Sequence, residues 1–179
     1  RSFAPLDPAD PVHRFWASRS RQLFQGSLTR AMCTGRASFP IGKHPSIIPG
    51  QYCDFHAVSY RGRSTVSGPG KGPGKGPGKG PGHGLPADDL GREIDPQGIV
   101  EVCREVCKLL PRPVYITANG VCDGADAFRA RYIAEHLEAL CTSDLPVERY
   151  YYWSLLDGWE WALGRSARFG LTGVDPQTG

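Results

Sequence analysis

The sequence lacks the features that mark several classes of protein. No apolar run approaches the roughly 18 residues of a membrane-spanning helix, so we expect no membrane partner. No stretch resembles a secretion signal, and we expect a cytoplasmic protein. The net charge is only +3 and comes partly from lysines in one repetitive stretch, so we expect no nucleic-acid partner.

The cysteines also lack a recognisable pattern. The six of them form no CxxC pair and no cluster with histidine at the sequence spacing of a zinc site. We therefore expect reduced thiols, no bound metal and no cofactor. Cys103 and Cys107 are four residues apart on a predicted helix, where small apolar thiols usually pack in the core.

What is present is an alternation of strand-like and helix-like patterns. Short β-rich runs occupy residues 53–60, 113–117 and 149–156. Apolar side chains at helical spacing occupy residues 12–24, 96–110 and 128–140. Strands separated by helices of this length indicate βαβ units with parallel strands, and therefore an α/β fold. Three such strands cannot close a barrel by themselves.

The segments around the first helical pattern carry their own signals. Residues 1–11 contain three prolines and are predicted to be an extended entry segment. Arg19 interrupts the apolar stripe of the first helix, and we expect a break there. The glycines at the end of the stripe predict that the helix ends between Gly26 and Gly35.

Residues 68–82 repeat a four-residue unit, GPGKGPGKGPGKGPG. A collagen helix needs glycine at every third position, so this period excludes collagen. We interpret residues 68–84 as a flexible, solvated loop within a single unit formed by residues 1–179. The loop is either a basic lid or polyanion-binding arm, or a tolerated insertion. We favour the insertion because loops lengthen at small entropic cost.

Two motifs near the end of the chain resemble those of a known enzyme family. Residues 115–120 read YITANG and residues 153–164 read WSLLDGWEWALG, which are similar to the YITENG and WSLLDNFEWALG of family 1 glycoside hydrolases. Residues 54–60 and 168–171 agree with further motifs of the family, in the same order. The chain resembles the C-terminal part of a retaining β-glycosidase of the β-glucosidase or 6-phospho-β-glucosidase type.

The resemblance implies a fold as well as a family. Family 1 enzymes are (β/α)8 TIM barrels, so the three β-rich runs would be barrel strands six, seven and eight with their helices. Strands one to five would be absent, leaving a partial barrel. The active site of such a barrel lies at the C-terminal ends of its strands, which is where the motifs fall in the predicted elements.

The resemblance also implies that the catalytic residues are missing. Retaining glycosidases use one carboxylate as acid/base and a second as the nucleophile that forms a glycosyl-enzyme. The nucleophile position is occupied by Ala118, whose methyl group cannot attack an anomeric carbon. The acid/base belongs to a strand upstream of Arg1. Arg61 also replaces the tyrosine that would hydrogen-bond the nucleophile, so we expect no intact catalytic residue and no glycoside hydrolysis.

Four sugar-contacting positions are retained, according to the resemblance. Trp153 would stack on the sugar, Glu160 would accept hydrogen bonds from its hydroxyls, and Trp161 would donate through its indole N–H. Phe169 would line the pocket. An aromatic plate beside a carboxylate and an N–H donor suits the apolar faces and hydroxyl edges of a sugar. The resemblance therefore implies a β-glycoside or sugar ligand.

Three functions fit these residues. The chain is an inactive remnant of a retaining β-glycosidase, which we favour, or a carbohydrate-binding pseudoenzyme, or an engineered glycosynthase without its nucleophile. The missing strands and Arg61 count against the glycosynthase. A partial barrel would expose strand edges and an apolar inner face, so we also expect self-association and marginal stability.

Several other polar or aromatic side chains are interpreted as structural. His136 lies on an apolar helix face and is expected to be a hydrogen-bonded packing residue. Asp123 and Asp126 fit a helix N-terminus, where carboxylates cap unpaired N–H groups. Tyr150 and Tyr152 alternate with their neighbour along a strand, so we expect them to support the fold rather than the site. Asp95 followed by Pro96 predicts another helix start, with Asp95 at the capping position.

Overall fold

The computed structural model describes residues 2–42, 45–69 and 84–175. Most of the expected loop at residues 68–84 lies outside these ranges, and so do the three lysines of its repeat. Within them, no helix is both long and apolar enough to cross a membrane.

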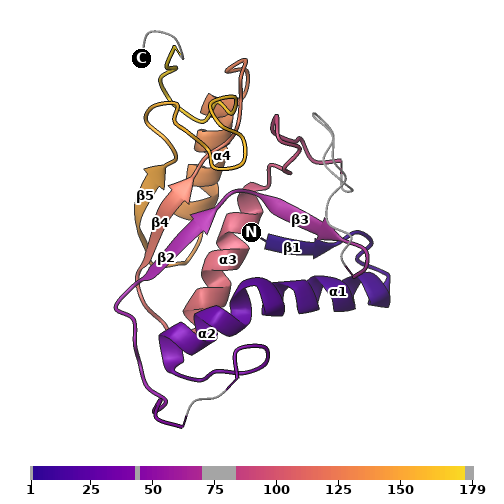
Figure 1. Cartoon of the computed structure of the whole chain (residues 1–179), viewed down its shortest axis with the longest axis vertical. Coiled ribbons are helices and arrows are strands. Elements are labelled where there is room, and N and C mark those ends of the chain that lie inside the picture. The colour runs from indigo at the N-terminus through magenta and orange to yellow at the C-terminus, as the bar shows by residue number, and fades with distance from the viewer. Residues whose placement is uncertain (1, 43–44, 70–83, 176–179) are drawn as a thin grey trace.

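A parallel sheet of three strands forms the centre of the molecule. Its strands are β2 (His56–Tyr60), β4 (Val114–Asn119) and β5 (Val147–Tyr152), in the order β2-β4-β5. Val58 pairs with Ile116, and Ile116 pairs with Tyr150, all in parallel. The predicted adjacent parallel strands and the α/β class are therefore confirmed, and Figure 1 shows the three arrows pointing the same way.

Two helices connect these strands and cover one face of the sheet. They are α3 (Pro96–Leu109), which contacts β2, and α4 (Arg129–Cys141), which contacts α3 and β5 (Figure 1). The two faces of the sheet differ in burial because side chains alternate between them along each strand. In β2 the side chains of His56, Val58 and Tyr60 are buried, whereas those of Ala57 and Ser59 are exposed.

The core between the sheet and the helices is built mainly from aliphatic side chains. It includes Val58, Ile99, Val102, Cys103, Val114, Ile116 and Leu140. Cys107 packs against it from the same helix as Cys103, as the spacing predicts. His136 is fully buried and its Nδ1 lies 2.8 Å from the carbonyl oxygen of Tyr132, so the prediction of a packing role is confirmed.

A second sheet has two strands, and one of them follows a strand of the central sheet directly along the chain. β1 (Ser2–Pro5) and β3 (Arg63–Val66) pair in parallel, and β3 follows β2 after only two residues. The second of these, Gly62, has a φ of 126°, and a side chain there would meet the carbonyl oxygen of Glu93. Sequence patterns missed both strands, because four residues show too little alternation to be recognised. The expected entry segment at residues 1–11 contains β1.

The first helical region is one continuous run. It consists of α1 (Pro11–Arg21), the π-helical turn η1 (Gln22–Gly26) and α2 (Ser27–Thr34). Arg19 lies inside α1, so the expected break at this residue is wrong; arginine is a good helix former whose charge can reach solvent. The run ends at Gly35, whose φ of 64° is typical of a helix C-terminus and lies within the predicted range.

The carboxylates expected to cap helix α4 differ in what they bind. Asp123 accepts hydrogen bonds from the backbone N–H groups of Ala127, Phe128 and Arg129 at 3.1, 2.8 and 2.9 Å. Asp126 instead pairs with the side chain of Arg129 at 2.7 Å. The capping prediction therefore holds for Asp123 only, because one carboxylate already binds the N–H groups at this end of the helix.

Asp95 precedes the first residue of α3, as predicted, but its side chain forms no capping hydrogen bond. Its carboxylate instead lies 3.2 Å from Nε of Arg63. The hydroxyl of Tyr60 donates to the backbone carbonyl of Asp95 at 2.9 Å. The residue thus ties the start of α3 to the strands β2 and β3.

Candidate functional site

The candidate site lies at the C-terminal ends of the three central strands. Ser59 of β2 pairs with Ala118 of β4, and Asn119 pairs with Tyr152 of β5. The backbone N–H of Trp153 donates to the carbonyl oxygen of Asn119 at 2.9 Å. Ala118 and Trp153 therefore lie at the same end of the sheet, and the segment that follows β5 folds beyond the strand tips (Figure 1).

Asn119 holds the strand ends in place. Its buried amide donates to the backbone carbonyl of Tyr60 at 3.0 Å and to the hydroxyl of Tyr132 at 2.8 Å. Its oxygen accepts from the hydroxyl of Tyr150 at 2.7 Å. Burial raises the pKa of both Tyr132 and Tyr150, so their hydroxyls stay protonated at neutral pH. Tyr152 has a similar supporting role, because its hydroxyl accepts from Arg129 at 3.1 Å.

Glycine at position 120 lets the two neighbouring strand ends approach. A Cβ atom on Gly120 would collide with the carbonyl oxygen of Trp153. The glycine of the YITANG motif therefore has a steric reason in this fold, independent of chemistry.

Two of the predicted sugar-contacting side chains touch each other. Nε1 of Trp153 donates to Oε1 of Glu160 at 3.0 Å, and 42% of Trp153 is exposed. The loop that carries Glu160 is held by Asp157, which accepts from the Gly170 N–H at 2.8 Å and from Arg168 at 2.8 Å. Burial acts to raise the pKa of Asp157, but these donors outweigh it and the pKa is lowered. The carboxylate is therefore an ionised anchor for the loop.

Two arginines stack on the aromatic rings of the site. The guanidinium of Arg61 lies 5.1 Å from the ring centre of Trp153 and 5.5 Å from that of Phe169. Arg92 lies 5.0 Å from the centre of the Phe169 ring. Burial, and then the charge of Arg92, lower the pKa of Arg61, while Glu160 opposes them. The site therefore has a cationic wall as well as an aromatic one.

The remaining predicted positions are placed differently. Phe169 is almost fully buried beneath the two guanidinium groups, and Trp161 is 99% exposed. Their assigned contacts with a sugar stay predictions. Sequence reasoning missed Arg92 altogether, because a cation over an aromatic ring has no signature in the linear spacing of the two residues.

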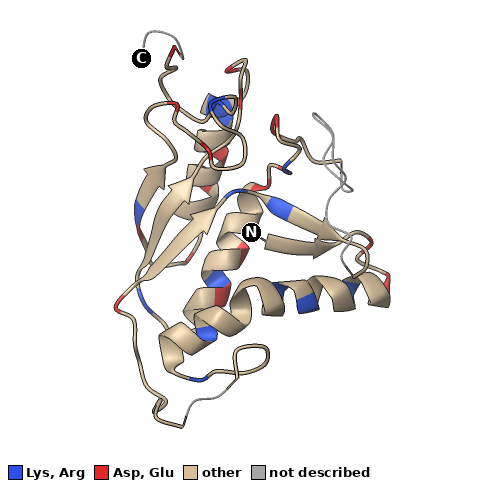
Figure 2. Cartoon of the chain, viewed as in Figure 1, with Lys and Arg blue, Asp and Glu red and all other residues tan. Residues whose placement is uncertain are grey.

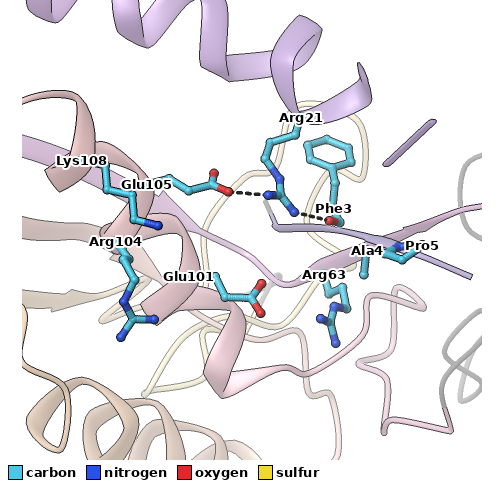
Figure 3. Close-up of a pocket in the computed structure, with 9 residues that line it drawn as sticks. All are labelled: Phe3, Ala4, Pro5, Arg21, Arg63, Glu101, Arg104, Glu105 and Lys108. Carbon is cyan, nitrogen blue, oxygen red and sulfur yellow. Dashed lines mark hydrogen bonds and ion pairs between the residues drawn. The ribbon is translucent and has the colours of Figure 1, made fainter. Parts of the chain in front are cut away.

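A separate hollow of about 280 Å³ lies between β1, α3 and the end of α1 (Figure 3). Its lining is charged, and α3 carries both signs along its length (Figure 2). Arg21 donates to Glu105 at 2.6 Å and to the carbonyl oxygen of Phe3 at 2.9 Å, as the dashed lines of Figure 3 show. Arg63 is also paired, with Asp95. We therefore interpret the charged side chains around the hollow as an ion-pair network that joins α1 to α3.

One cluster in the described part of the chain has the side chains of a metal site. Sγ of Cys33, Sγ of Cys53 and a ring nitrogen of His56 all lie within 4.8 Å of one another. All six cysteines are unpaired. The sequence shows no cysteine–histidine cluster at the spacing of a zinc site, and the fold brings one together from separate segments. Sequence spacing could not reveal it, because 20 residues separate the cysteines and folding brings α2 against the start of β2.

Comparisons with known proteins agree with the motifs. The model of the family "Glycosyl hydrolase family 1" matches residues 59–179. A β-galactosidase of Saccharolobus solfataricus is 39% identical over 98 residues, which are 53% of this chain and 20% of that protein. A chloroplastic galactolipid galactosyltransferase of Arabidopsis thaliana is 36% identical over 128 residues, which are 68% of this chain and 19% of that protein.

The fold comparison gives the same result. A solved β-glycosidase from Pyrococcus horikoshii is 26% identical, with a TM-score of 0.80, and the match covers 98% of this chain and 41% of that one. The chain thus spans about a fifth of the length of the two curated relatives and less than half of the solved barrel. The inferred resemblance to a C-terminal part and the partial barrel are both confirmed.

Proposed function

Because the chain belongs to glycosyl hydrolase family 1, we propose that it is a β-glycosidase segment that does not hydrolyse glycosides. The observation that carries the proposal is the position of Ala118. It occupies the C-terminal end of β4, beside Ser59 of β2, at the end of the sheet where a barrel enzyme places its catalytic groups. A methyl group there can form no glycosyl-enzyme.

Neighbouring carboxylates do not replace the missing one. Asp123 binds three backbone N–H groups at the start of α4, and Asp126 pairs with Arg129. Glu160 accepts from Trp153 in the loop beyond β5. A retaining mechanism needs two carboxyl groups roughly 5–5.5 Å apart, one protonated and one ionised. These three carboxylates are committed to other contacts.

The test is hydrolysis of dinitrophenyl β-glucoside, whose leaving group needs little protonation. We expect no turnover by the chain and no recovery in Ala118→Glu, because Arg61 can pair with the new carboxylate and hold it out of line for attack. Ala118→Gln, which has the same shape without the charge, is the matched control for background hydrolysis.

Restored activity would contradict the proposal in a defined way. Loss of the general acid typically lowers the rate of hydrolysis by roughly 10²–10⁴-fold. The loss is greatest for substrates whose leaving group is not activated. Turnover of an unactivated disaccharide by Ala118→Glu would therefore show that another residue supplies the acid, and that the chain is a repairable enzyme.

Sugar binding without chemistry is a second candidate function, favoured by the Trp153–Glu160 contact. The pair offers a partly exposed aromatic face next to a carboxylate, which is the chemistry that binds a sugar ring and its hydroxyls. The guanidinium of Arg61 lies 5.1 Å from the centre of the Trp153 ring and adds a cation beside this pair.

Calorimetric titration with a β-glucoside tests this second function. We expect saturable binding that is lost in Trp153→Ala and kept in Trp159→Ala, which removes an exposed indole from the same loop. Binding that both variants retain would mean that the sugar binds elsewhere on the chain. No binding by the folded chain would rule out this second function and leave the inactive glycosidase segment as the proposed function.

A further inference from the structure

We propose that Cys33, Cys53 and His56 bind a zinc ion at the N-terminal end of the central sheet, and that the ion fastens α2 to the start of β2. Cys33 lies in the last turn of α2, Cys53 three residues before β2, and His56 is the first residue of β2. The site is thus at the opposite end of the strands from Ala118 and Trp153, and it is independent of the proposed function.

The distances are close to those of a zinc site. The three ligand atoms lie within 4.8 Å of one another, and Cys33 Sγ is 3.9 Å from Nδ1 of His56. Around tetrahedral zinc, with bonds of about 2.3 Å to sulfur and 2.0–2.1 Å to nitrogen, such atoms lie roughly 3.5–3.8 Å apart. Closing the cluster onto an ion therefore needs movements of about 1 Å or less.

The histidine is oriented as a ligand. Nε2 of His56 lies 2.7 Å from the backbone carbonyl oxygen of Leu110, and a carbonyl can only accept, so Nε2 carries the proton. The neutral ring then presents the lone pair of Nδ1 to Cys33. A histidine that donates its second N–H to a carbonyl while the other nitrogen faces thiols is the usual outer arrangement of a zinc ligand.

The surroundings allow an ion to enter and remain. A hollow of about 540 Å³ opens onto the cluster, and its lining includes all three residues together with Met32, Tyr52 and Asp54. Cys33 and His56 are buried, whereas Cys53 is half-buried. Three protein ligands leave the fourth tetrahedral position to a water molecule from this hollow.

Zinc explains why two thiols and an imidazole share one buried place. Binding converts both thiols to thiolates and releases two protons to solvent, while the ion keeps its charge of +2. The backbone already joins the partners, because Tyr52 N–H donates to the carbonyl oxygen of Cys33 at 3.0 Å.

The experiment uses the whole 179-residue chain, purified under reducing, metal-free conditions, with Co²⁺ as the probe. We expect one Co²⁺ per chain, with the visible absorption of a tetrahedral thiolate complex, and displacement by one equivalent of Zn²⁺. Zn²⁺ should also raise the Tm by several degrees, because only the folded chain holds the three ligands together.

Four variants locate the site. Cys33→Ser and Cys53→Ser should weaken Co²⁺ binding by at least roughly 10-fold, and Cys107→Ser and Cys141→Ser should leave it unchanged. If circular dichroism shows that Cys33→Ser is less folded, Cys53→Ser decides the result, because its side chain is half-buried. Equal Co²⁺ binding by all four variants would overturn the proposal. So would a Cys33–Cys53 disulfide in the protein isolated without reductant, or no stoichiometric binding by the folded chain.

Discussion

His136, one of two buried histidines, is expected to make the stability of this chain depend on pH. His136 lies against the rings of Tyr132 and Tyr60, and its Nδ1 faces the carbonyl oxygen of Tyr132. Because that oxygen can only accept, Nδ1 carries the proton, and Nε2 is a buried nitrogen with no hydrogen-bond partner among the described residues. Burial lowers the pKa of His136 to about 4 from an ordinary value of 6.5, since a charged ring there would lose its hydration.

We predict that the free energy of unfolding falls between pH 6.5 and pH 4 because of His136. The unfolded chain binds a proton at this residue below pH 6.5 and the folded chain does not, so the contribution is complete above pH 6.5 and lost on acidification. The full difference is about 3 kcal/mol. Urea unfolding at a series of pH values measures it.

His136→Phe should flatten the pH profile over this range, and His13→Gln, which changes a histidine on α1, should leave the slope in place. An unchanged slope in His136→Phe would mean that carboxylates cause the loss of stability in acid.

At the residue scale, the sequence predicted part of the candidate site. The motif placed Ala118, Trp153 and Glu160 at one end of the sheet, since barrel topology fixes where each strand ends. It did not predict that Arg61 stacks on Trp153, because the resemblance described only the tyrosine that Arg61 replaces. The cluster around Cys33 was also missed, since contacts between distant segments leave no trace in spacing.

At the scale of elements, predictions succeeded where the pattern was long. The strands β2, β4 and β5 combine β-rich residues with the helices α3 and α4 that separate them along the chain, and both signals agree. The strands β1 and β3 have four residues each and depend on pairing with one another, which local preference does not contain. The helical run from α1 to α2 was misread at one residue, because a polar side chain on an apolar stripe can still face solvent.

The start of helix α4 provides a test at this scale. Asp123 satisfies three backbone N–H groups, whereas Asp126 makes one ion pair on a mostly exposed side chain. We predict that Asp123→Ala lowers the free energy of unfolding by about 1–2 kcal/mol, as expected for a lost helix cap. Asp126→Ala should change it by less than Asp123→Ala does, because the Asp126 side chain is 73% exposed and Arg129 keeps its hydrogen bonds to Val121, Asp123 and Tyr152.

Chemical denaturation of the two variants, in parallel with the unmodified chain, gives the comparison. Equal losses for Asp123→Ala and Asp126→Ala would mean that the ion pair to Arg129, and not the cap, holds the start of the helix.

For the molecule as a whole, the main feature is a sheet covered on one face only. Helices α3 and α4 pack on the side of Val58 and Ile116, and the other side carries Tyr115, Tyr151 and Arg149. Phe55 stacks on Tyr115 at 4.5 Å, and Arg149 lies 5.0 Å from the same ring. The open face is therefore aromatic and polar together, and not uniformly apolar as expected from the sequence.

This open face leads to a prediction about the 179-residue chain in solution. Exposed aromatic rings, together with strand edges of β2 and β5 that pair with no described strand, favour contact with a second copy, which would bury both. We expect the mass measured by light scattering after size exclusion to rise with concentration, and thermal unfolding to be broad. Replacing the stacked pair by Phe55→Ser and Tyr115→Thr should lower the measured mass toward that of the monomer.

Ile48→Ser is the matched control, because Ile48 is an exposed apolar side chain outside the sheet, in the segment between α2 and β2. It should leave the association unchanged. Equal association by the double variant and the control would show that the open face is not the contact surface. A sharp, cooperative transition in a sample that stays monomeric at high concentration would show that β2, β4 and β5 with two helices are stable without any cover on their second face.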